Sequence, residues 1–119
     1  NYQAKIIKDL AEKESCIIVG RCADFILKDY DNVIKVFIWA PHDVCVKTVM
    51  DMFGMSEKDA DKKIRKINKH RSEHYHYYTC REWDNARNYD LCLNSAELGF
   101  NGCVEAIKAY INVLENVEK

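Results

Sequence analysis

Arg21 stands where its side chain can bind a phosphate. It follows an apolar run, residues 16–19, that ends at Gly20, and Asp24 lies three residues further on. The run is typical of a short buried strand, and ligands of α/β proteins bind at the carboxyl ends of such strands. A guanidinium group pairs with phosphate through two parallel hydrogen bonds and remains charged at neutral pH. We therefore expect Arg21 to hold a negatively charged group, in the first place a phosphate.

A second arginine, Arg71, lies in a long helix that is predicted to begin after Ser56. An apolar stripe runs along this helix from Ala60 to Ile67, and two further steps of four residues reach Arg71 and Tyr75. This spacing predicts that Arg71 lies on the inward face, where an arginine is seldom found without a partner. Such a position favours a role in binding an anion. An arginine whose stem packs while its head reaches solvent or an acid fits the spacing equally well.

The elements that would position these residues alternate between helices and strands. Helices are predicted over residues 2–13, 41–53 and from 56 onward, with a short helix or turn at 23–27 and a closing helix at 104–117. Strands are predicted over residues 16–19, 33–39 and 88–94, and a turn at 99–102. Strands separated by helices predict an α/β three-layer sandwich with a parallel sheet. Residues 1–119 carry no linker or repeat and are interpreted as a single domain.

The composition is that of an ordinary globular protein, with 48% hydrophobic and 31% charged residues and a net charge of −1. This balance argues against a nucleic acid polymer or a membrane surface as partner. No apolar run is long enough to span a membrane, and no signal peptide is recognisable, so a cytoplasmic location is expected. The six cysteines form no CxxC pair and are predicted to be reduced. Cys16, Cys92 and Cys103 lie in apolar runs and are expected to be buried.

Four stretches, in this order, resemble the cytidylate kinase-like branch of the nucleoside monophosphate kinases. They read IIVGRCADFIL (17–27), VFIWAP (36–41), RSEHYHYYTCREW (71–83) and NYDLCLN (88–94). The resemblance covers roughly residues 5–112. It implies a P-loop kinase-like fold with a lid region at about 56–87. It also implies transfer of the terminal phosphate of ATP to CMP, dCMP or a related monophosphate, with Mg²⁺ accompanying ATP.

The resemblance also implies roles for individual residues. Arg21 would bind the phosphate of the acceptor nucleotide, and Arg71 would contact the phosphoryl group in transit. Asp90 matches the acid of the family's NYDL motif and is expected to be catalytic. The implied substrate-binding residues are Arg21, Asp24, Tyr75 and Tyr78. The two acids, Asp24 and Asp90, could pair with the two arginines or order water and metal. The oligomeric state is a separate question, and a homo-oligomer is an open alternative.

The sequence departs from the family pattern in ways that bear on activity. No two of its four glycines have the spacing of a P-loop, so the chain resembles the carboxyl-terminal portion of such a kinase, incomplete at its N-terminal side. We expect it to hold neither ATP nor Mg²⁺ alone and to be inactive alone. Cys45 and Thr48 stand where the family usually has two arginines. Asn68 replaces an acid, and Cys80 replaces a glycine.

Three side-chain groups have two interpretations each. His70, His74, His76 and Cys80 could bind zinc, but one helix does not bring all four together, which favours a polar lid helix. Tyr75, Tyr77, Tyr78 and Trp83 could stack on a base or form core or lid packing, and packing is favoured. Cys22 could be a reactive thiol beside Arg21, although a packing cysteine is favoured.

Three functions therefore compete. The first is a nucleoside monophosphate kinase-like protein whose complete form phosphorylates CMP or dCMP. The second is a non-catalytic nucleotide-binding or regulatory module derived from that fold, which the missing P-loop and the Cys45 and Thr48 positions favour. The third is a structural subunit that completes a sheet by association.

Overall fold

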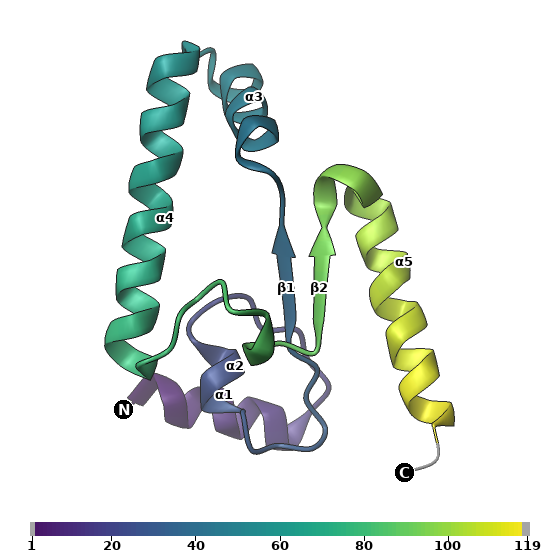
Figure 1. Ribbon diagram of the computed structural model, residues 1–119. Coiled ribbons are helices and arrows are strands. Elements are labelled where there is room, and N and C mark those ends of the chain that lie inside the picture. Colours follow the sequence, from purple (N-terminus) through teal and green to yellow (C-terminus); the bar gives the residue numbers. More distant parts are fainter. Residues whose placement is uncertain (1, 118–119) are drawn as a thin grey trace.

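The computed structural model describes residues 2–117 and is a mixed α/β fold (Figure 1). Its elements in chain order are α1 (Tyr2–Lys13), α2 (Ala23–Ile26), β1 (Val36–Trp39), α3 (His42–Phe53), α4 (Glu57–Thr79), the 3-10 helix η1 (Ala86–Asn88), β2 (Leu91–Asn94) and α5 (Ser95–Asn116). In Figure 1 the α3–α4 hairpin extends beyond the arrowheads of the strands, α1 and α2 lie near the opposite end of the sheet, and α5 lies beside β2.

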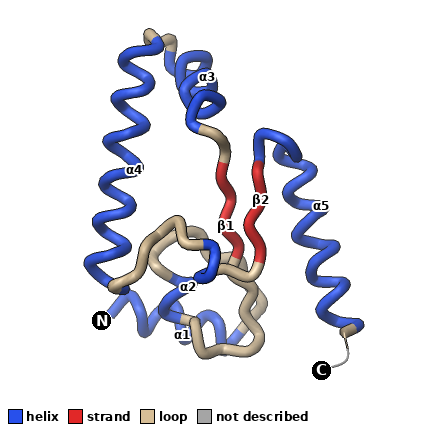
Figure 2. The backbone as a smooth tube through the Cα atoms, in the orientation of Figure 1, coloured by secondary structure: helices blue, strands red, loops and turns tan. Residues whose placement is uncertain are grey.

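The sheet of the described residues consists of β1 and β2, which pair in parallel from Val36↔Leu91 to Trp39↔Asn94 (Figure 2). The chain crosses between them through α3 and α4, and α5 packs against both strands. The predicted parallel sheet is thus confirmed on a small scale. The third strand and the full three-layer sandwich are not seen within residues 2–117.

Residues 16–19, predicted as a strand, form an extended loop. Ile17 is 94% exposed and Val19 is 84% exposed, and only Ile18 packs, against the cluster of Ile7 and Ala23. A strand needs a ladder partner for its backbone groups. Both described strands pair only with each other, so an apolar run alone did not suffice to make a strand here. The other two predicted strands are confirmed but shorter.

The α3–α4 hairpin forms where local sequence signals predict it. Pro41 immediately precedes α3, and Gly54 ends α3 with a φ of 64°, the left-handed conformation that favours glycine. The Ser56 hydroxyl accepts a hydrogen bond of 3.2 Å from the Asp59 backbone N–H and so caps α4. Between the two helices lies a buried cluster of Val46, Ala60 and Ile64.

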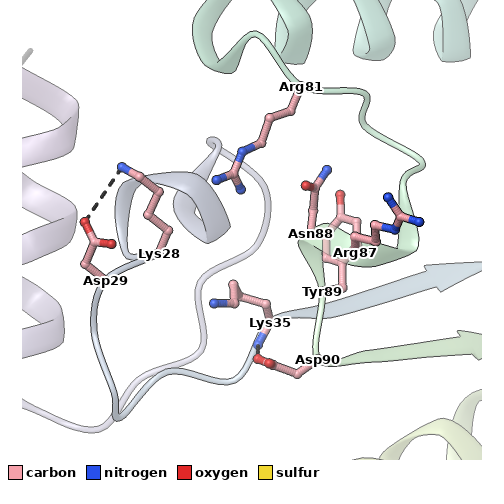
Figure 3. A pocket seen from close by; sticks show the side chains of 8 residues that line it. All are labelled: Lys28, Asp29, Lys35, Arg81, Arg87, Asn88, Tyr89 and Asp90. Atoms are coloured by element: carbon pink, nitrogen blue, oxygen red, sulfur yellow. Dashed lines mark hydrogen bonds and ion pairs between the residues drawn. The ribbon is translucent and has the colours of Figure 1, made fainter.

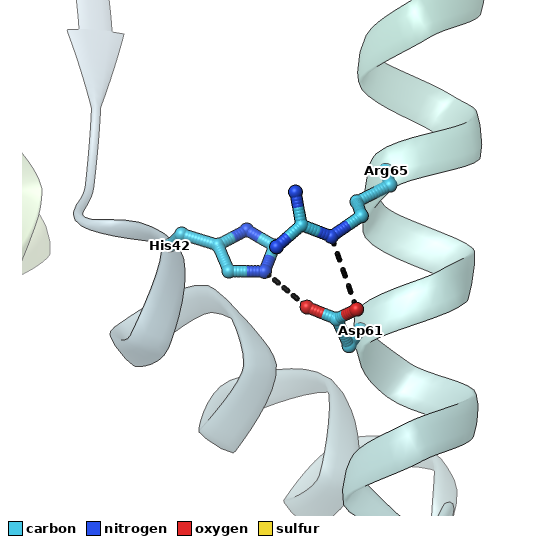
Figure 4. Close-up of polar contacts among 3 residues, drawn as sticks. All are labelled: His42, Asp61 and Arg65. Carbon is cyan, nitrogen blue, oxygen red and sulfur yellow. Dashed lines mark hydrogen bonds and ion pairs between the residues drawn. The ribbon is translucent and has the colours of Figure 1, made fainter.

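A polar network joins the same two helices at the surface (Figure 4). His42 Nε2 donates a hydrogen bond of 2.5 Å to one oxygen of Asp61, and Arg65 Nε donates one of 3.0 Å to the other oxygen. The hydrogen bond from His42, and then that from Arg65, lower the pKa of the Asp61 carboxyl below its ordinary value. The carboxylate therefore links α3 to α4 in its charged form.

The last helix differs from its prediction. A turn was expected at 99–102 and a helix from 104, but α5 begins at Ser95 and contains a single break at Gly99, where φ is 70° and ψ is 176°. The Asn94 side chain accepts a hydrogen bond from the Ala96 N–H and caps the helix at this earlier start. Glycine tolerates the break because it has no Cβ.

The described cysteines are all free thiols. Cys103 is buried as predicted, whereas Cys16 and Cys92 are exposed, because the loop and the strand that carry them are covered on fewer sides than their apolar sequences indicate. Among residues 2–117, no helix has both the length and the apolar character needed to cross a membrane.

Candidate functional site

The Gly20–Arg21 turn has an unusual backbone. Three consecutive residues, Gly20, Arg21 and Cys22, have positive φ values of 69°, 60° and 55°. The Gly20 carbonyl accepts a hydrogen bond of 3.1 Å from the Ala23 N–H and closes the turn directly before α2. Positive φ costs a residue with a Cβ about 1 kcal/mol or more, and such strain gathers at functional sites. The turn leaves the Arg21 side chain exposed.

Asp24 connects this turn to the end of α4. The Tyr75 hydroxyl donates a hydrogen bond of 2.6 Å to Asp24 Oδ2. Tyr75 is buried, and this burial, followed by the bond to Asp24, raises the pKa of its hydroxyl far above the usual range. The phenol is therefore a permanent donor to a carboxylate. Burial, followed by the nearby Asp24 charge, also raises the pKa of the Cys22 thiol, which favours the packing cysteine over the reactive one.

Arg71 is exposed, so its predicted inward position is wrong. The apolar periodicity of α4 continues through this region, but α3 covers only the first turns of α4, at Ala60 and Ile64. Ile67, one turn before Arg71, is already 41% exposed. No carboxylate of the described chain lies within ion-pair distance of Arg71, so its charge is free to meet an anion.

The aromatic residues near the end of α4 divide into two groups. Tyr75 is buried, and Trp83 packs edge-on against Phe37 at a centroid distance of 5.2 Å, as core residues do. Tyr77 and Tyr78 are exposed, so they are not core residues, and lid packing or base stacking stays a prediction for these two. Tyr78 contacts Tyr77 and His74 through ring contacts of 4.9 and 4.8 Å.

The four side chains that were weighed as zinc ligands and set aside do not converge on one point. His70 stacks on His74, and His76 Nδ1 lies 3.4 Å from Glu82 Oε1 on the next segment. Cys80 ends α4 in a left-handed conformation and is exposed. Residues 2–117 contain no group of three or more histidine, cysteine or acidic side chains arranged to hold a metal ion.

Asp90 lies at the amino ends of the strands. Its carboxylate accepts a hydrogen bond of 2.8 Å from the Lys35 N–H, and the Asp90 N–H donates one of 2.7 Å to the Lys35 carbonyl. This double contact extends the pairing of β1 and β2 by one residue. Asp90 therefore lies at the amino ends of β1 and β2, whereas Trp39 and Asn94 mark their carboxyl ends.

Sequence reasoning missed a basic pocket around Asp90 (Figure 3). The cavity has a volume of about 320 Å³. Its lining residues are Lys28, Asp29, Lys35, Arg81, Arg87, Asn88, Tyr89 and Asp90. They come from the segment after α2, the start of β1 and the segment between α4 and β2. No spacing pattern in the sequence links residues so far apart, which is why the pocket was not predicted.

A second, mainly apolar hollow of about 370 Å³ lies near the carboxyl end of β1. Phe37, Trp39 and Trp83 contribute its aromatic lining, and Asn68 of α4 contributes an amide. The Phe37 ring also stacks on Tyr89 at a centroid distance of 4.9 Å, which fixes this aromatic surface. The hollow is of a size and composition that small-molecule sites commonly have.

The structure thus brings together only part of the predicted site. Asp24 and Tyr75 are in direct contact, and through them the turn of Arg21 and the helix of Arg71 are joined. Tyr78 lies one turn beyond Tyr75 but faces solvent. Asp90 belongs to the basic pocket.

The parallel strands, the helical hairpin between them and the arginine turn bonded to that hairpin make up a mixed α/β fold. The chain belongs to the cytidylate kinase-like family, whose family model matches residues 1–97. No curated protein matches the chain.

A solved relative supports the same fold. The crystal structure of an uncharacterized protein from Eubacterium ventriosum ATCC 27560 is similar to this chain with a TM-score of 0.85 and 35% sequence identity. The match covers 93% of this chain and 63% of that protein, so the chain spans less than two thirds of its relative's length.

Proposed function

We propose that this protein is nucleoside monophosphate kinase-like and that its complete form transfers the terminal phosphate of ATP to CMP, dCMP or a related nucleotide. The observation that carries the proposal is the Tyr75–Asp24 hydrogen bond. Arg21 lies three residues before Asp24, and Arg71 lies one helical turn before Tyr75. The bond therefore connects the segment that carries Arg21 to the helix that carries Arg71, and both arginines are candidates for binding phosphate. Membership in the cytidylate kinase-like family supports this reading.

Arg21 is proposed to clamp the acceptor phosphate. Its guanidinium is exposed and has no carboxylate partner within the described part of the chain. The strained turn holds its backbone in one conformation, which lowers the entropy that is lost when a ligand binds. A planar fork of N–H donors matches two phosphate oxygens at once.

Arg71 is proposed to stabilise the phosphoryl group during transfer. Phosphoryl transfer needs little covalent help from the protein and depends on positioning and on positive charge near the migrating group. An exposed arginine on a lid helix meets that need when the helix closes over the nucleotides. The predicted catalytic role of Asp90 has less support, because its carboxylate is engaged by the Lys35 N–H.

The apolar hollow of Phe37, Trp39, Trp83 and Asn68 is proposed to receive the base. Aromatic rings offer a stacking surface, and the Asn68 amide offers both a donor and an acceptor to the edge of a base. The hollow lies beside Trp39, at the carboxyl end of β1, where ligands of parallel α/β folds bind.

Mg²⁺ and ATP belong to the proposed reaction of the complete protein. The described residues offer no cluster of three ligands for a metal ion, so we assign Mg²⁺ to no residue of this chain. When bound with ATP, the ion would neutralise the negative charge that develops on the phosphates. The residues of this chain would bind and orient the acceptor beside it.

A second candidate function is a nucleotide-binding module without turnover. Two positions of α3 favour it. The Thr48 hydroxyl donates a hydrogen bond of 3.0 Å to the Val44 carbonyl within its own helix, and the Cys45 thiol lies 3.7 Å from the Ala40 carbonyl. Neither side chain supplies the positive charge that the family usually places there, so acceptor binding can persist while the rate of transfer falls.

Binding and turnover are measured separately on the intact protein. Calorimetric titration with CMP, dCMP and UMP is expected to show binding to the wild type and loss of at least about ten-fold in affinity for Arg21→Ala, since a charged hydrogen-bonded pair contributes about 1.5–3 kcal/mol. A coupled assay of ADP release on the complete form of the protein then distinguishes the kinase, which turns over, from the binding module, which does not. Residues 1–119 alone are expected to show no turnover. Absence of binding, or binding unchanged in Arg21→Ala, would contradict the proposal.

A further inference from the structure

The basic pocket at the amino ends of β1 and β2 is not used by the proposed kinase site. Its cations are Lys28, Lys35, Arg81 and Arg87, and its acids are Asp29 and Asp90. The pocket thus carries an excess of two positive charges, in a chain whose net charge is −1. Charges of one sign around a cavity repel each other, and an anion between them relieves that repulsion.

Both acids are already engaged by other groups. Asp90 accepts the hydrogen bond from the Lys35 N–H, and Asp29 lies 3.9 Å from the Lys28 ammonium. Within residues 2–117, no carboxylate lies within ion-pair distance of Arg81 or Arg87. The two guanidinium groups therefore keep their full capacity for an anion. Arginine is the residue best suited to bind phosphate in such a place.

Arg81 is held in position before any ligand arrives. Its guanidinium carbon lies 4.9 Å from the centroid of the Phe25 ring, and the Lys28 ammonium lies 4.3 Å from the same centroid. The Arg81 N–H also donates a hydrogen bond of 3.1 Å to the Thr79 hydroxyl, which fixes the backbone after α4. One aromatic ring thus gathers two cations, each by a cation–π contact.

Figure 3 shows how the side chains are arranged around the cavity. Arg81 and Lys35 extend from opposite sides into the space between the end of α2 and η1. Lys28 turns toward Asp29, and the guanidinium of Arg87 lies on the outer side of η1. Arg81 and Lys35 are therefore the central pair, and Lys28 and Arg87 flank them.

We propose that this pocket binds a small molecule through a phosphate or pyrophosphate group, held chiefly by Arg81 and Lys35. A volume of about 320 Å³ is enough for a pyrophosphate with a group attached, but too small for an extended polymer. The net charge of −1 also gives the chain no overall positive field for a nucleic acid polymer. Arg21 does not line the pocket, so the ligand proposed here is additional to an acceptor nucleotide held by Arg21.

The test is a calorimetric titration of the intact protein with inorganic pyrophosphate at low ionic strength. We expect saturable binding to the wild type and a loss of at least about ten-fold in affinity for both Arg81→Gln and Lys35→Gln. Lys108→Gln, on the exposed surface of α5, is the matched control and is expected to bind as the wild type does. Thermal unfolding of each variant checks that the fold is kept. If Arg81→Gln does not fold, Lys35→Gln, which removes only a terminal charge, tests the proposal by itself.

Three outcomes overturn the proposal. The first is absence of pyrophosphate binding by the wild type. The second is an equal effect of Lys35→Gln and Lys108→Gln, which would show a general charge effect. Arg21→Ala distinguishes this pocket from the proposed acceptor site, because it is expected to weaken CMP binding and leave pyrophosphate binding unchanged. If Arg21→Ala lost pyrophosphate binding while Arg81→Gln and Lys35→Gln kept it, the anion would lie at the acceptor site, and this result would contradict the proposal. Titration with inorganic phosphate and with CDP then shows whether the pocket prefers a free anion or a nucleotide.

Discussion

The Tyr75 hydroxyl donates a hydrogen bond of 2.6 Å to the Asp24 carboxylate and so joins helix α4 to the turn that carries Arg21. The two residues are 51 positions apart in the chain. Burial, followed by the hydrogen bond to Asp24, raises the pKa of Tyr75, so its hydroxyl remains a donor at neutral pH. This bond links the two segments that carry the arginines of the candidate site.

Tyr75→Phe tests the strength of that link. The ring is kept and only the hydroxyl is lost, so we expect the free energy of unfolding to fall by about 1.5–3 kcal/mol, the range for a hydrogen bond to a charged acceptor. Denaturant unfolding measures the change. Tyr77→Phe is the matched control, because Tyr77 is 79% exposed and its substitution is expected to change stability by less than about 0.5 kcal/mol. Equal effects of the two substitutions would contradict the structural role of Tyr75.

Arg21→Gly tests whether the turn stores backbone strain. Arg21 has a φ of 60°, which glycine adopts without the steric cost of a Cβ. We expect Arg21→Gly to be more stable than Arg21→Ala by about 0.5–1 kcal/mol, while both lose CMP binding. Thermal or denaturant unfolding of the two variants gives the difference. A glycine variant that is less stable than the alanine variant would show that the left-handed turn is not strained.

Asp61→Asn tests the network that joins α3 and α4. The pKa of Asp61 is lowered from its ordinary value of 3.8, first by the His42 hydrogen bond and then by Arg65. A lowered pKa in the folded state means that the stabilisation is present above 3.8 and is lost as the pH falls through the lower folded value. Unfolding midpoints measured from about pH 6 to about pH 3 are therefore expected to fall more steeply for the wild type than for Asp61→Asn. Identical slopes would mean that the network does not stabilise the hairpin.

Thiol reactivity tests the environment of Cys22. Only the thiolate reacts, and burial together with Asp24 raises the pKa of the Cys22 thiol. We expect iodoacetamide at neutral pH to modify the exposed Cys80 first, Cys22 more slowly and the buried Cys103 last. Peptide mapping by mass spectrometry gives the three rates. Modification of Cys22 ahead of Cys80 would restore the reactive-thiol interpretation.

Elements with local signals were predictable from the sequence. The Gly54 stop and the Ser56 cap of the helical hairpin depend on residues a few positions apart, and both are found. Predictions that depended on a distant partner were less successful. The run 16–19 has the composition of a strand but no strand beside it among residues 2–117, and Arg71 continues an apolar stripe beyond the part of α4 that α3 covers.

The same distinction applies to the candidate site. The contact of Asp24 with Tyr75 joins two residues that the family resemblance had placed near the substrate, although it did not show that they bind each other. The pocket of Lys35 and Arg81 could not be read from the sequence, because its residues come from separate loops whose meeting depends on how β1 and β2 pair.

The central claim is that Arg21 holds the phosphate of an acceptor nucleotide, and a comparison of CMP with cytidine tests it most directly. Calorimetry on the intact wild type is expected to show at least about ten-fold tighter binding of CMP than of cytidine, because only CMP offers a phosphate to the guanidinium. In Arg21→Ala this preference is expected to disappear while cytidine binds as before. Equal affinities of the wild type for CMP and cytidine, or a preference for CMP that survives in Arg21→Ala, would contradict the claim.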